Sequence, residues 1–268
     1  MSHSAITGRS KLLGIIADPV AQARSPGLAN ALLAEQKRFG EFVLLPLHVP
    51  LPSLGVVLTG LRGIQNFAGA IVSMPHKEAI VPLLDEVTLE AQTVGAVNVI
   101  RRETSGRLIG TMLDGEGFVA GLRSAGYAVH GKACLLVGAG GAAAAIAFAL
   151  AKYGCTSLTI SNRTEARALT LAARVQAAWP GLQVQAGKPP NGRYDLAINA
   201  TSLGMNPTDE LPMSLEMIEN SDLVAECVVA PEITALLETA RQKGREIHTG
   251  VPMLASQMAL MLEFMGVE

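Results

Sequence analysis

Short apolar runs alternate with longer stretches of mixed polar and apolar residues along the first third of this chain. The apolar runs have the length of strands, and residues 11–18 (KLLGIIAD) give the clearest example of a buried one. Strands are predicted at residues 11–18, 42–49, 69–73, 97–102 and 107–110. Helices are predicted at residues 26–37, with Ser25 as the N-cap, at 54–61, from Pro75 onward, and at 88–93. This alternation predicts a mostly parallel sheet with helices on both faces.

The rest of the chain continues the alternation. Strands are predicted at residues 133–137, 157–161, 184–186, 195–199, 222–227 and near Ile247. Helices are predicted at residues 114–125, 165–178, 232–243 and 252–265, and one more runs from the glycine cluster after residue 137 to about Lys152. The predicted fold class is α/β with two domains, an N-terminal mostly parallel α/β substrate domain and a C-terminal Rossmann dinucleotide-binding domain. We expect the first domain to span residues 1–110, completed by the helix at 251–268, and the second to span 111–250. The cleft between two such domains is the expected place for a substrate.

A glycine cluster joins the strand at 133–137 to the helix that follows, within the run LLVGAGGAAAAI. Gly138 would make the tight turn, Gly140 would let the backbone approach a pyrophosphate, and Ala143 would let helix and strand pack closely. The helix N-terminus would offer unpaired N–H groups and a positive dipole end to the phosphates. This context predicts that the residues binding a dinucleotide include Gly138, Ala139, Gly140, Gly141 and Ala142.

The stretch between Lys132 and Lys152 carries no charge and is about as long as a membrane span. It consists mostly of Ala and Gly, with the glycine cluster in its middle, so a buried strand and helix are the better interpretation. The 268-residue chain has 49% apolar residues, 4% aromatic residues and a formal net charge of −2. That composition predicts a soluble globular protein without nucleic-acid or membrane partners.

The cysteines and histidines form no ligand pattern. The three cysteines are widely spaced without a Cys-x-x-Cys pair, and they are Cys134, Cys155 and Cys227. They are expected to be small core residues in a reducing, cytoplasmic compartment. No apolar core precedes Lys11, so no signal peptide is expected. The five histidines are scattered, so no metal is expected, and His76 is interpreted as packing at a helix start.

The end of the second strand in a Rossmann unit decides which cofactor is favoured. An acidic side chain there binds a ribose 2′-hydroxyl, whereas arginine suits a 2′-phosphate. Here residues 161–164 read SNRT, without Asp or Glu, and Arg167 follows one helical turn after Arg163. NADP is therefore the predicted cofactor, with solvated helix-start charges as the alternative interpretation. Glu165 would cancel part of the positive field, so the use of NAD stays open.

A lysine lies at the start of a predicted helix in the first domain, in VSMPHK at residues 72–77. The end of a strand followed by a loop is where α/β sheets place their chemistry. The positive end of the helix and burial would both favour the neutral amine of Lys77, which could then act as a general acid and base. Taken alone, a lysine in such a place is more often an ordinary surface lysine.

Several blocks accompany this lysine and the glycine cluster. They are SP at 25–26, PHK at 75–77, GAVN at 95–98, DG at 114–115, GAGGA at 138–142, NRTEAR at 162–167, NATSLGM at 199–205, and Gln257 in GVPMLASQ. In this order they resemble the shikimate dehydrogenase family, from about Gly14 to the end of the chain. The resemblance implies reversible NAD(P)-dependent hydride transfer between the ring 3-hydroxyl of shikimate, or of a related cyclic hydroxy acid, and its 3-keto form.

The resemblance also implies roles for individual residues. Lys77 and Asp114 would be the catalytic pair, with Lys77 moving the proton and Asp114 hydrogen-bonding the same hydroxyl and orienting the lysine. The expected substrate-binding residues are Ser25, Ser73, Asn98, Asp114 and Gln257. Besides the glycine cluster, the expected cofactor-binding residues are Asn162, Arg163, Thr164, Arg167, Thr201, Ser202, Met205, Cys227 and Gly250.

The chain departs from the family's usual pattern at polar substrate contacts. Apolar residues stand where the family usually has Ser, Asn, Asn and Tyr, at Ala23, Ile71, Met112 and Val229, and Glu226 replaces an Asp. Each lost hydrogen bond to a carboxylate is worth roughly 1.5–3 kcal/mol, so losing the hydroxyls at Ala23 and Val229 would weaken shikimate binding by about 10²–10⁴-fold. Arg24 could supply a carboxylate contact instead. The chain also ends soon after Gln257, where the family usually has one more helix.

These departures resemble divergent members associated with aminoshikimate or secondary metabolism, so weak activity on shikimate, or a different substrate, is expected. Two other functions stay open. One is a nucleotide-binding regulatory protein that has lost turnover, although the retained Lys77, Asp114, Asn98 and Gln257 argue against it. The other is a different two-domain dehydrogenase, such as one for methylene-tetrahydrofolate, which the NRTEAR and NATSLGM blocks fit less well. We expect a monomer or a homodimer.

Overall fold

The computed structural model describes residues 5–187 and 192–267. Two compact units divide the chain, the first comprising Met1–Leu113 and Gln257–Glu268 and the second Asp114–Ser256. Each unit is built on one six-stranded sheet with helices, which confirms the predicted two-domain α/β fold class. The expectations about a leader at residues 1–4 and about the end at Glu268 lie outside the described residues.

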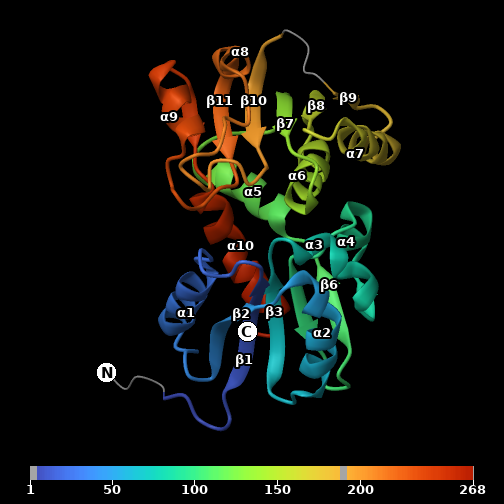
Figure 1. Ribbon diagram of the computed structural model, residues 1–268, viewed down its shortest axis with the longest axis vertical. Helices are drawn as coiled ribbons and strands as arrows, with labels where there is room; N and C mark the ends of the chain where they lie inside the picture. Colours follow the sequence, from blue (N-terminus) through green and yellow to red (C-terminus); the bar gives the residue numbers. More distant parts are fainter. Residues whose placement is uncertain (1–4, 188–191, 268) are drawn as a thin grey trace. The chain divides into compact units, whose positions relative to one another are not determined.

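The sheet of the first unit has the strand order β2-β1-β3-β5-β6-β4 (Figure 1). Its strands are β1 (Lys11–Ala17), β2 (Phe42–His48), β3 (Phe67–Val72), β4 (Glu86–Val87), β5 (Val99–Arg102) and β6 (Leu108–Thr111). β1 pairs in parallel with β2 and β3, whereas β5 is antiparallel to both β3 and β6. The strands predicted at 97–102 and 107–110 are present as β5 and β6, and they form an antiparallel pair around a turn in which Gly106 has φ +89°.

The helices of this unit are α1 (Ser25–Glu35), η1 (Leu51–Ser53), α2 (Leu54–Gly63), α3 (His76–Ala79), η2 (Val81–Leu83), α4 (Leu89–Val94) and the part of α10 (Val251–Phe264) from Gln257 onward. One expectation is wrong, because Ser25 is not the N-cap of α1. Arg24 holds that position with helical φ −87° and ψ −14°, and no side chain caps the helix. Ser25 is therefore the first helical residue, and it is buried.

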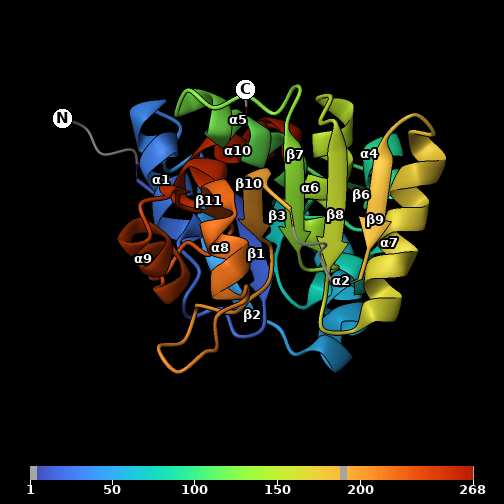
Figure 2. The same ribbon diagram turned by 90° about the horizontal axis from the view of Figure 1, so that it is seen from above.

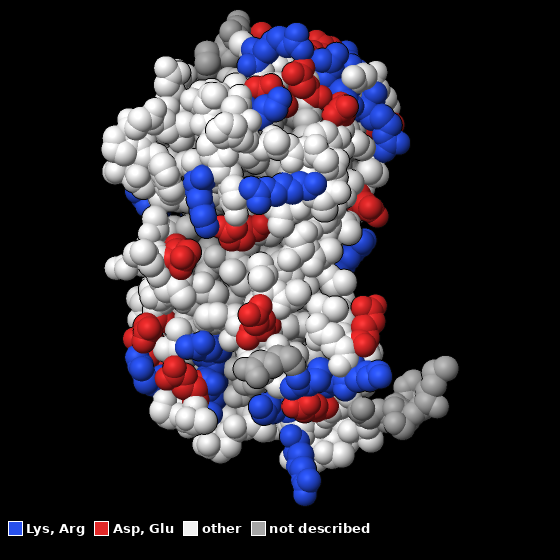
Figure 3. Space-filling model, turned by 180° about the vertical axis from the view of Figure 1, so that it is seen from behind, with Lys and Arg blue, Asp and Glu red and all other residues white. Residues whose placement is uncertain are grey.

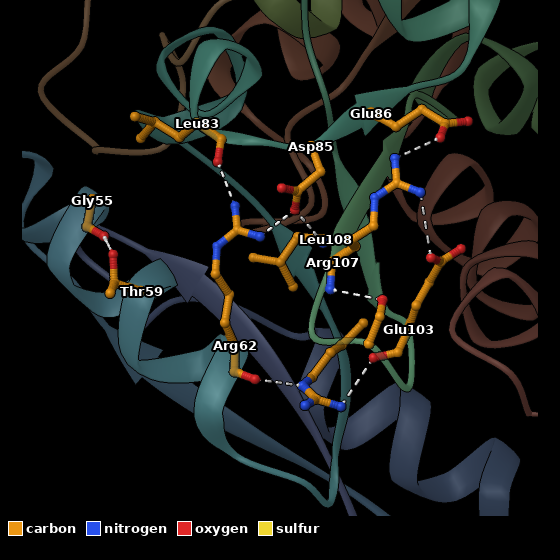
Figure 4. A network of polar contacts seen from close by, with 11 residues as sticks. Gly55, Thr59, Arg62, Leu83, Asp85, Glu86, Glu103, Arg107 and Leu108 are labelled. Atoms are coloured by element: carbon orange, nitrogen blue, oxygen red, sulfur yellow. Dashed lines mark hydrogen bonds and ion pairs between the residues drawn. The ribbon is translucent and has the colours of Figure 1, made fainter.

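A network of charged side chains joins α2 to the strands at the far end of the sheet (Figure 4). Arg62 binds the Asp85 carboxylate and donates to the Leu83 carbonyl at 2.9 Å, while the Leu108 N–H donates to Asp85 at 2.7 Å. Arg107 pairs with Glu86 at 3.1 Å. The network fixes the loop before β4 and the start of β6, so we assign it a structural role.

The sheet of the second unit has the order β12-β11-β10-β7-β8-β9, and every pair is parallel (Figure 2). Its strands are β7 (Ala133–Val137), β8 (Ser157–Ser161), β9 (Gln183–Ala186), β10 (Tyr194–Asn199), β11 (Ser221–Glu226) and β12 (Glu246–His248). Numbered within the unit, this order is 3-2-1-4-5-6, the Rossmann order that binds dinucleotides where the strand sequence reverses. The reversal lies between β7 and β10. The predicted Rossmann fold is thereby confirmed.

The helices of the second unit are α5 (Asp114–Ser124), α6 (Gly141–Lys152), α7 (Glu165–Ala178), α8 (Leu215–Glu219), α9 (Ala235–Gln242) and the start of α10. All but α8 were predicted from the sequence. α5 packs against α6, and Gly115 makes the close approach possible, because a Cβ there would lie 2.3 Å from the Ala145 carbonyl oxygen. Residues 143–151 of α6 are all buried, as its uncharged sequence requires.

On the face shown in Figure 3, acidic and basic side chains lie among one another, and most of the surface carries neither. No helix of the described residues is long and apolar enough to cross a membrane. Cys134 and Cys155 are buried as expected, but Cys227 is only half-buried, so the expectation that all three cysteines are core residues is wrong for Cys227.

Candidate active site

Lys77 lies on the single turn of α3, directly after the end of β3. The chain between them contains the cis peptide bond Met74–Pro75, and Pro75 is the N-cap. The Ser73 N–H donates to the Ile16 carbonyl and the His76 N–H to the Ser73 carbonyl, both at 2.9 Å, so the turn is fixed to the sheet. Lys77 is half-buried, and its carbonyl accepts from Val97 N–H at 2.8 Å.

The helix that carries Lys77 is too short to produce the dipole field that the sequence analysis expected. α3 has four residues, too few for peptide dipoles to sum to an appreciable field.

Asn98 and Gln257 are brought together, although they are 159 residues apart. Asn98 Nδ2 donates to Gln257 Oε1 at 3.2 Å, and Asn98 Oδ1 accepts from the Leu113 N–H at 2.8 Å. The Asn98 side chain is 1% exposed and Gln257 is 5% exposed. A buried amide with both ends engaged is held in one orientation, and it fixes the backbone next to Asp114.

His76 is fully buried, next to the backbone of Val49. Burial lowers its pKa, because the charged ring would lie in an apolar surrounding. His76 therefore packs as a neutral ring, which agrees with its interpretation as helix-start packing. In the described part of the chain, no group of three or more His, Cys, Asp or Glu residues could hold a metal ion.

The other positions predicted to face the substrate differ in how far they are exposed to solvent. Ser25 is buried and Ser73 is half-buried. Of the four positions with apolar replacements, Ile71 and Met112 are each 4% exposed and belong to the core. Ala23 and Val229 are half-buried, so these two retain accessible surface.

In the second unit, the glycine cluster forms the predicted strand–turn–helix. Gly138 follows β7 with φ +125°, and a Cβ there would lie 2.8 Å from the Ala200 carbonyl oxygen after β10. Only glycine accepts both that conformation and that approach. Gly140 is the extended N-cap of α6, with no side-chain cap and no acidic residue in the first turn.

An uncapped N-terminus of a buried helix suits an anion, because its first N–H groups have no intrahelical acceptors. Gly138 and Gly140 lie just before this helix, at the reversal of strand order between β7 and β10. Because they have no Cβ atoms, a ligand can approach their backbone closely. The residues present therefore fit the pyrophosphate of a dinucleotide.

The segment after β8 carries the predicted cofactor-selecting residues. Asn162 Nδ2 donates to the Thr164 carbonyl at 2.9 Å, which closes the turn before α7. Arg163 and Arg167 are both exposed. Glu165 points toward the end of β9, where its Oε1 lies 3.0 Å from the position of a Cβ on Gly187.

Asp114 is the first residue of α5 and is 2% exposed. Its neighbour Gly115 packs on α6, so the α5–α6 contact fixes the backbone next to Asp114. Burial of an acidic side chain at a helix N-terminus agrees with the favourable dipole interaction there.

The loop after β10 is ordered by residues that the sequence interpretation missed. Asn199 Oδ1 accepts from Thr201 N–H at 3.0 Å and from Thr201 Oγ1 at 2.7 Å. Asp209 Oδ2 accepts from the N–H groups of Asn206, at 3.0 Å, and Gly204, at 2.9 Å, and these bonds lower the pKa of Asp209. The Asn-x-Thr spacing of an Asx turn was the available signal.

Cys227 and Gly250, both predicted to bind the cofactor, lie close together after β11 and β12. A Cβ on Gly250 would lie 2.4 Å from the Val228 carbonyl oxygen and 2.7 Å from the carbonyl carbon of Cys227. Glycine at position 250 thus allows the start of α10 to approach the segment after β11. Ser202 and Met205 lie on the loop after β10, where Met205 N–H donates to the Ser202 carbonyl at 3.2 Å.

These features define a class: a two-domain α/β protein with a Rossmann unit and, in its other unit, a half-buried lysine on the turn after a strand. Comparison with known proteins identifies the family within this class.

The sequence model for the shikimate dehydrogenase substrate binding domain matches residues 15–100, and that for shikimate / quinate 5-dehydrogenase matches residues 122–204. A shikimate dehydrogenase (NADP(+)) of Rubrobacter xylanophilus is 38% identical over 272 residues, which cover 100% of this chain and 92% of the relative.

Comparison with solved structures points to the same family. The shikimate 5-dehydrogenase of Thermus thermophilus, in complex with NADP(H) and shikimate, is 33% identical with a TM-score of 0.82, covering 96% of this chain and 93% of that one. A 5-ketofructose reductase of a Gluconobacter species is 28% identical with a TM-score of 0.82, covering 98% and 95%. The chain belongs to the shikimate dehydrogenase family, as the sequence motifs predicted.

Proposed function

We propose that this chain is an NADP-dependent oxidoreductase that acts on a ring CH–OH group of shikimate or a related cyclic hydroxy acid. Its reaction is reversible hydride transfer between the hydroxyl and keto forms. The observation that supports this most strongly is the uncapped start of α6 behind Gly138, in a chain whose full length aligns with shikimate dehydrogenases.

Lys77 and Asp114 act on the same substrate hydroxyl. In the oxidation direction the Lys77 amine takes the hydroxyl proton as the C–H hydride leaves, and in reduction its ammonium returns that proton to the oxygen. Asp114 accepts a hydrogen bond from the hydroxyl or from the lysine, which keeps both oriented. NADP supplies the hydride acceptor when bound. Asn98 and Gln257 hold ring hydroxyls, and Ser25 and Ser73 bind the carboxylate and a hydroxyl.

The second unit, Asp114–Ser256, is the cofactor unit, to which the sequence assigned residues 111–250. Gly138–Ala142 hold the pyrophosphate, and Asn162–Thr164 with Arg167 hold the 2′-phosphate of NADP. The loop carrying Thr201, Ser202 and Met205, with Cys227 and Gly250, lines the nicotinamide side. The first unit, Met1–Leu113 with Gln257–Glu268, is the substrate unit, to which the sequence assigned residues 1–110 and 251–268.

Shikimate itself is a weak substrate in this proposal, because Ala23 and Val229 offer accessible apolar surface in place of a hydroxyl and a phenol. The fold also accommodates other substrates, since the Gluconobacter relative is a 5-ketofructose reductase. We place the enzyme in the cytoplasm, as a monomer or a homodimer.

The test is a steady-state screen of shikimate, quinate, aminoshikimate and their keto forms against NADP and NAD. The proposal expects NADP-linked turnover of at least one of them, with kcat/KM for shikimate well below about 10⁶ M⁻¹s⁻¹, which lies within the range of efficient enzymes. Efficient turnover of shikimate would refute the claim of a weak substrate, and no turnover of any compound would refute the assigned activity.

A further inference from the structure

A buried carboxyl group lies beneath the loop after β10. Glu226 is the last residue of β11, and the parallel pairing places it in register with Asn199, the last residue of β10. Both side chains are fully buried. Glu226 Oε2 accepts from Thr234 Oγ1 at 3.0 Å and from Asn199 Nδ2 at 3.4 Å.

The two partners of Glu226 shape the loop formed by residues 200–204. Besides binding Thr201, Asn199 donates to the Leu203 carbonyl at 3.0 Å. Thr234 caps α9 and also contacts the loop, since a Cβ on Gly204 would lie 3.2 Å from its Cγ2. Whatever displaces the Glu226 carboxyl therefore displaces both supports of the loop.

The second oxygen of this carboxyl, Oε1, is buried and has no hydrogen-bond partner in the described part of the chain. Burial raises the pKa of Glu226 to about 7, although the bonds from Thr234 and Asn199 act in the opposite direction. The neutral acid suits this surrounding, and the carboxylate leaves a charged oxygen unsatisfied.

The groups around the carboxyl do not titrate. Asn199 faces it from β10 and Thr234 from the start of α9, and no ion pair joins Glu226 to a basic residue among those described. The titratable residue on the neighbouring strand β12, His248, is in register with Ala225, so its side chain lies on the opposite face of the sheet.

We propose that Glu226 is a positioning residue that holds the loop at 200–204 ready for the cofactor only as the neutral acid, so that cofactor binding weakens as this carboxyl ionises. The inference rests on the proposed function, which assigns this loop to the nicotinamide side of the cofactor. Ionisation draws water toward Oε1, loosens Asn199 and Thr234, and releases the loop.

The experiment measures NADPH affinity by fluorescence titration at pH values from about 6 to 9. The variants are Glu226→Gln, which is neutral at every pH and keeps a carbonyl acceptor, and Glu216→Gln, a matched control on the exposed side of α8. The 2′-phosphate of NADPH also titrates near pH 6. Dividing the Kd of wild type by that of Glu226→Gln at each pH removes this contribution.

We expect this ratio to rise about tenfold or more between pH 6.5 and 8.5, as a single ionisation near 7 requires. Glu216→Gln should follow wild type at every pH. In steady state the effect should appear in KM for NADPH and leave kcat nearly unchanged. A ratio that stays constant within about twofold would overturn the proposal, because a purely structural role would weaken binding equally at all pH values.

Hydrogen exchange of the free protein provides a readout that needs no cofactor. After correction for the intrinsic pH dependence, peptides covering residues 200–204 should lose protection at pH 8.5 in wild type but not in Glu226→Gln. Equal protection in both proteins would also contradict the proposal. If wild type binds neither NADPH nor NADH, the proposed function fails, while the exchange result still decides whether Glu226 controls the loop.

Discussion

Gly115 should be a sensitive position for both stability and catalysis, although it has no side chain. In the Gly115→Ala variant the new methyl group would lie 2.3 Å from the Ala145 carbonyl oxygen and 2.9 Å from Ala149 Cβ. Ordinary contact begins at 3.4 Å, so α5 and α6 must separate by roughly 1 Å. The nearest obstacle is helix backbone, which cannot rotate away as a side chain would.

Overpacking of this kind costs about 1–3 kcal/mol, and the better helix propensity of alanine returns about 1 kcal/mol. We expect a net loss of up to about 2 kcal/mol in the free energy of unfolding, measured by urea denaturation. Because Asp114 precedes this glycine, a displacement of about 1 Å should also lower kcat by about 10²-fold.

A matched variant separates crowding from propensity. Gly60→Ala lies within α2, where a Cβ would meet nothing within 4 Å, so it should leave the protein equally stable or more stable by up to about 1 kcal/mol. The reasoning is refuted if Gly115→Ala is as stable and as active as wild type.

Three further changes have expected outcomes. Arg163→Ala should raise KM for NADP by about 10–100-fold, the value of a charged hydrogen bond, and change KM for NAD less than about twofold, measured by cofactor kinetics. Asn98→Ala should destabilise the protein by about 1–3 kcal/mol in urea denaturation, because it leaves the N–H of the half-buried Leu113 without its acceptor. Burial lowers the pKa of His76 below 6.5, so at lower pH the unfolded chain binds a proton that the folded chain does not. The free energy of unfolding should therefore decrease as the pH falls from about 6.5. This decrease should be smaller in His76→Gln.

For each of these three variants, a specific result would contradict the prediction. An equal loss of affinity for NADP and NAD in Arg163→Ala would place the arginine outside the 2′-phosphate site. Wild-type stability in Asn98→Ala would show that water replaces the lost acceptor. An unchanged pH slope in His76→Gln would assign the acid sensitivity to another group, such as His248, whose pKa burial also lowers.

The sequence predicted most of the fold because its signals were local. The uncharged run from Ala133 to Ala151 indicated a buried strand and helix, and Gly138 has the positive φ that its place in the motif requires. Failures arose where backbone conformation decided the outcome. Ser25 looked like a cap before a proline, but Arg24 already has helical angles.

The Glu226 network could not be predicted, because strand register creates it. Asn199 and Thr234 are 27 and 8 residues away from Glu226, and only the parallel pairing of β10 with β11 brings the three side chains together. Asn98 and Gln257 were predicted separately through the family resemblance, and the contact between them likewise follows from the tertiary fold.

The proton transfer assigned to Lys77 is the central claim, and the Lys77→Ala variant tests it most directly. Single-turnover reduction of NADP with the best substrate from the screen should slow by about 10²–10⁴-fold, the usual contribution of a general acid–base residue. NADPH affinity and the urea midpoint should stay at wild-type values. A rate within about tenfold of wild type would contradict the account, because hydride transfer would then proceed without the proton acceptor that we assign.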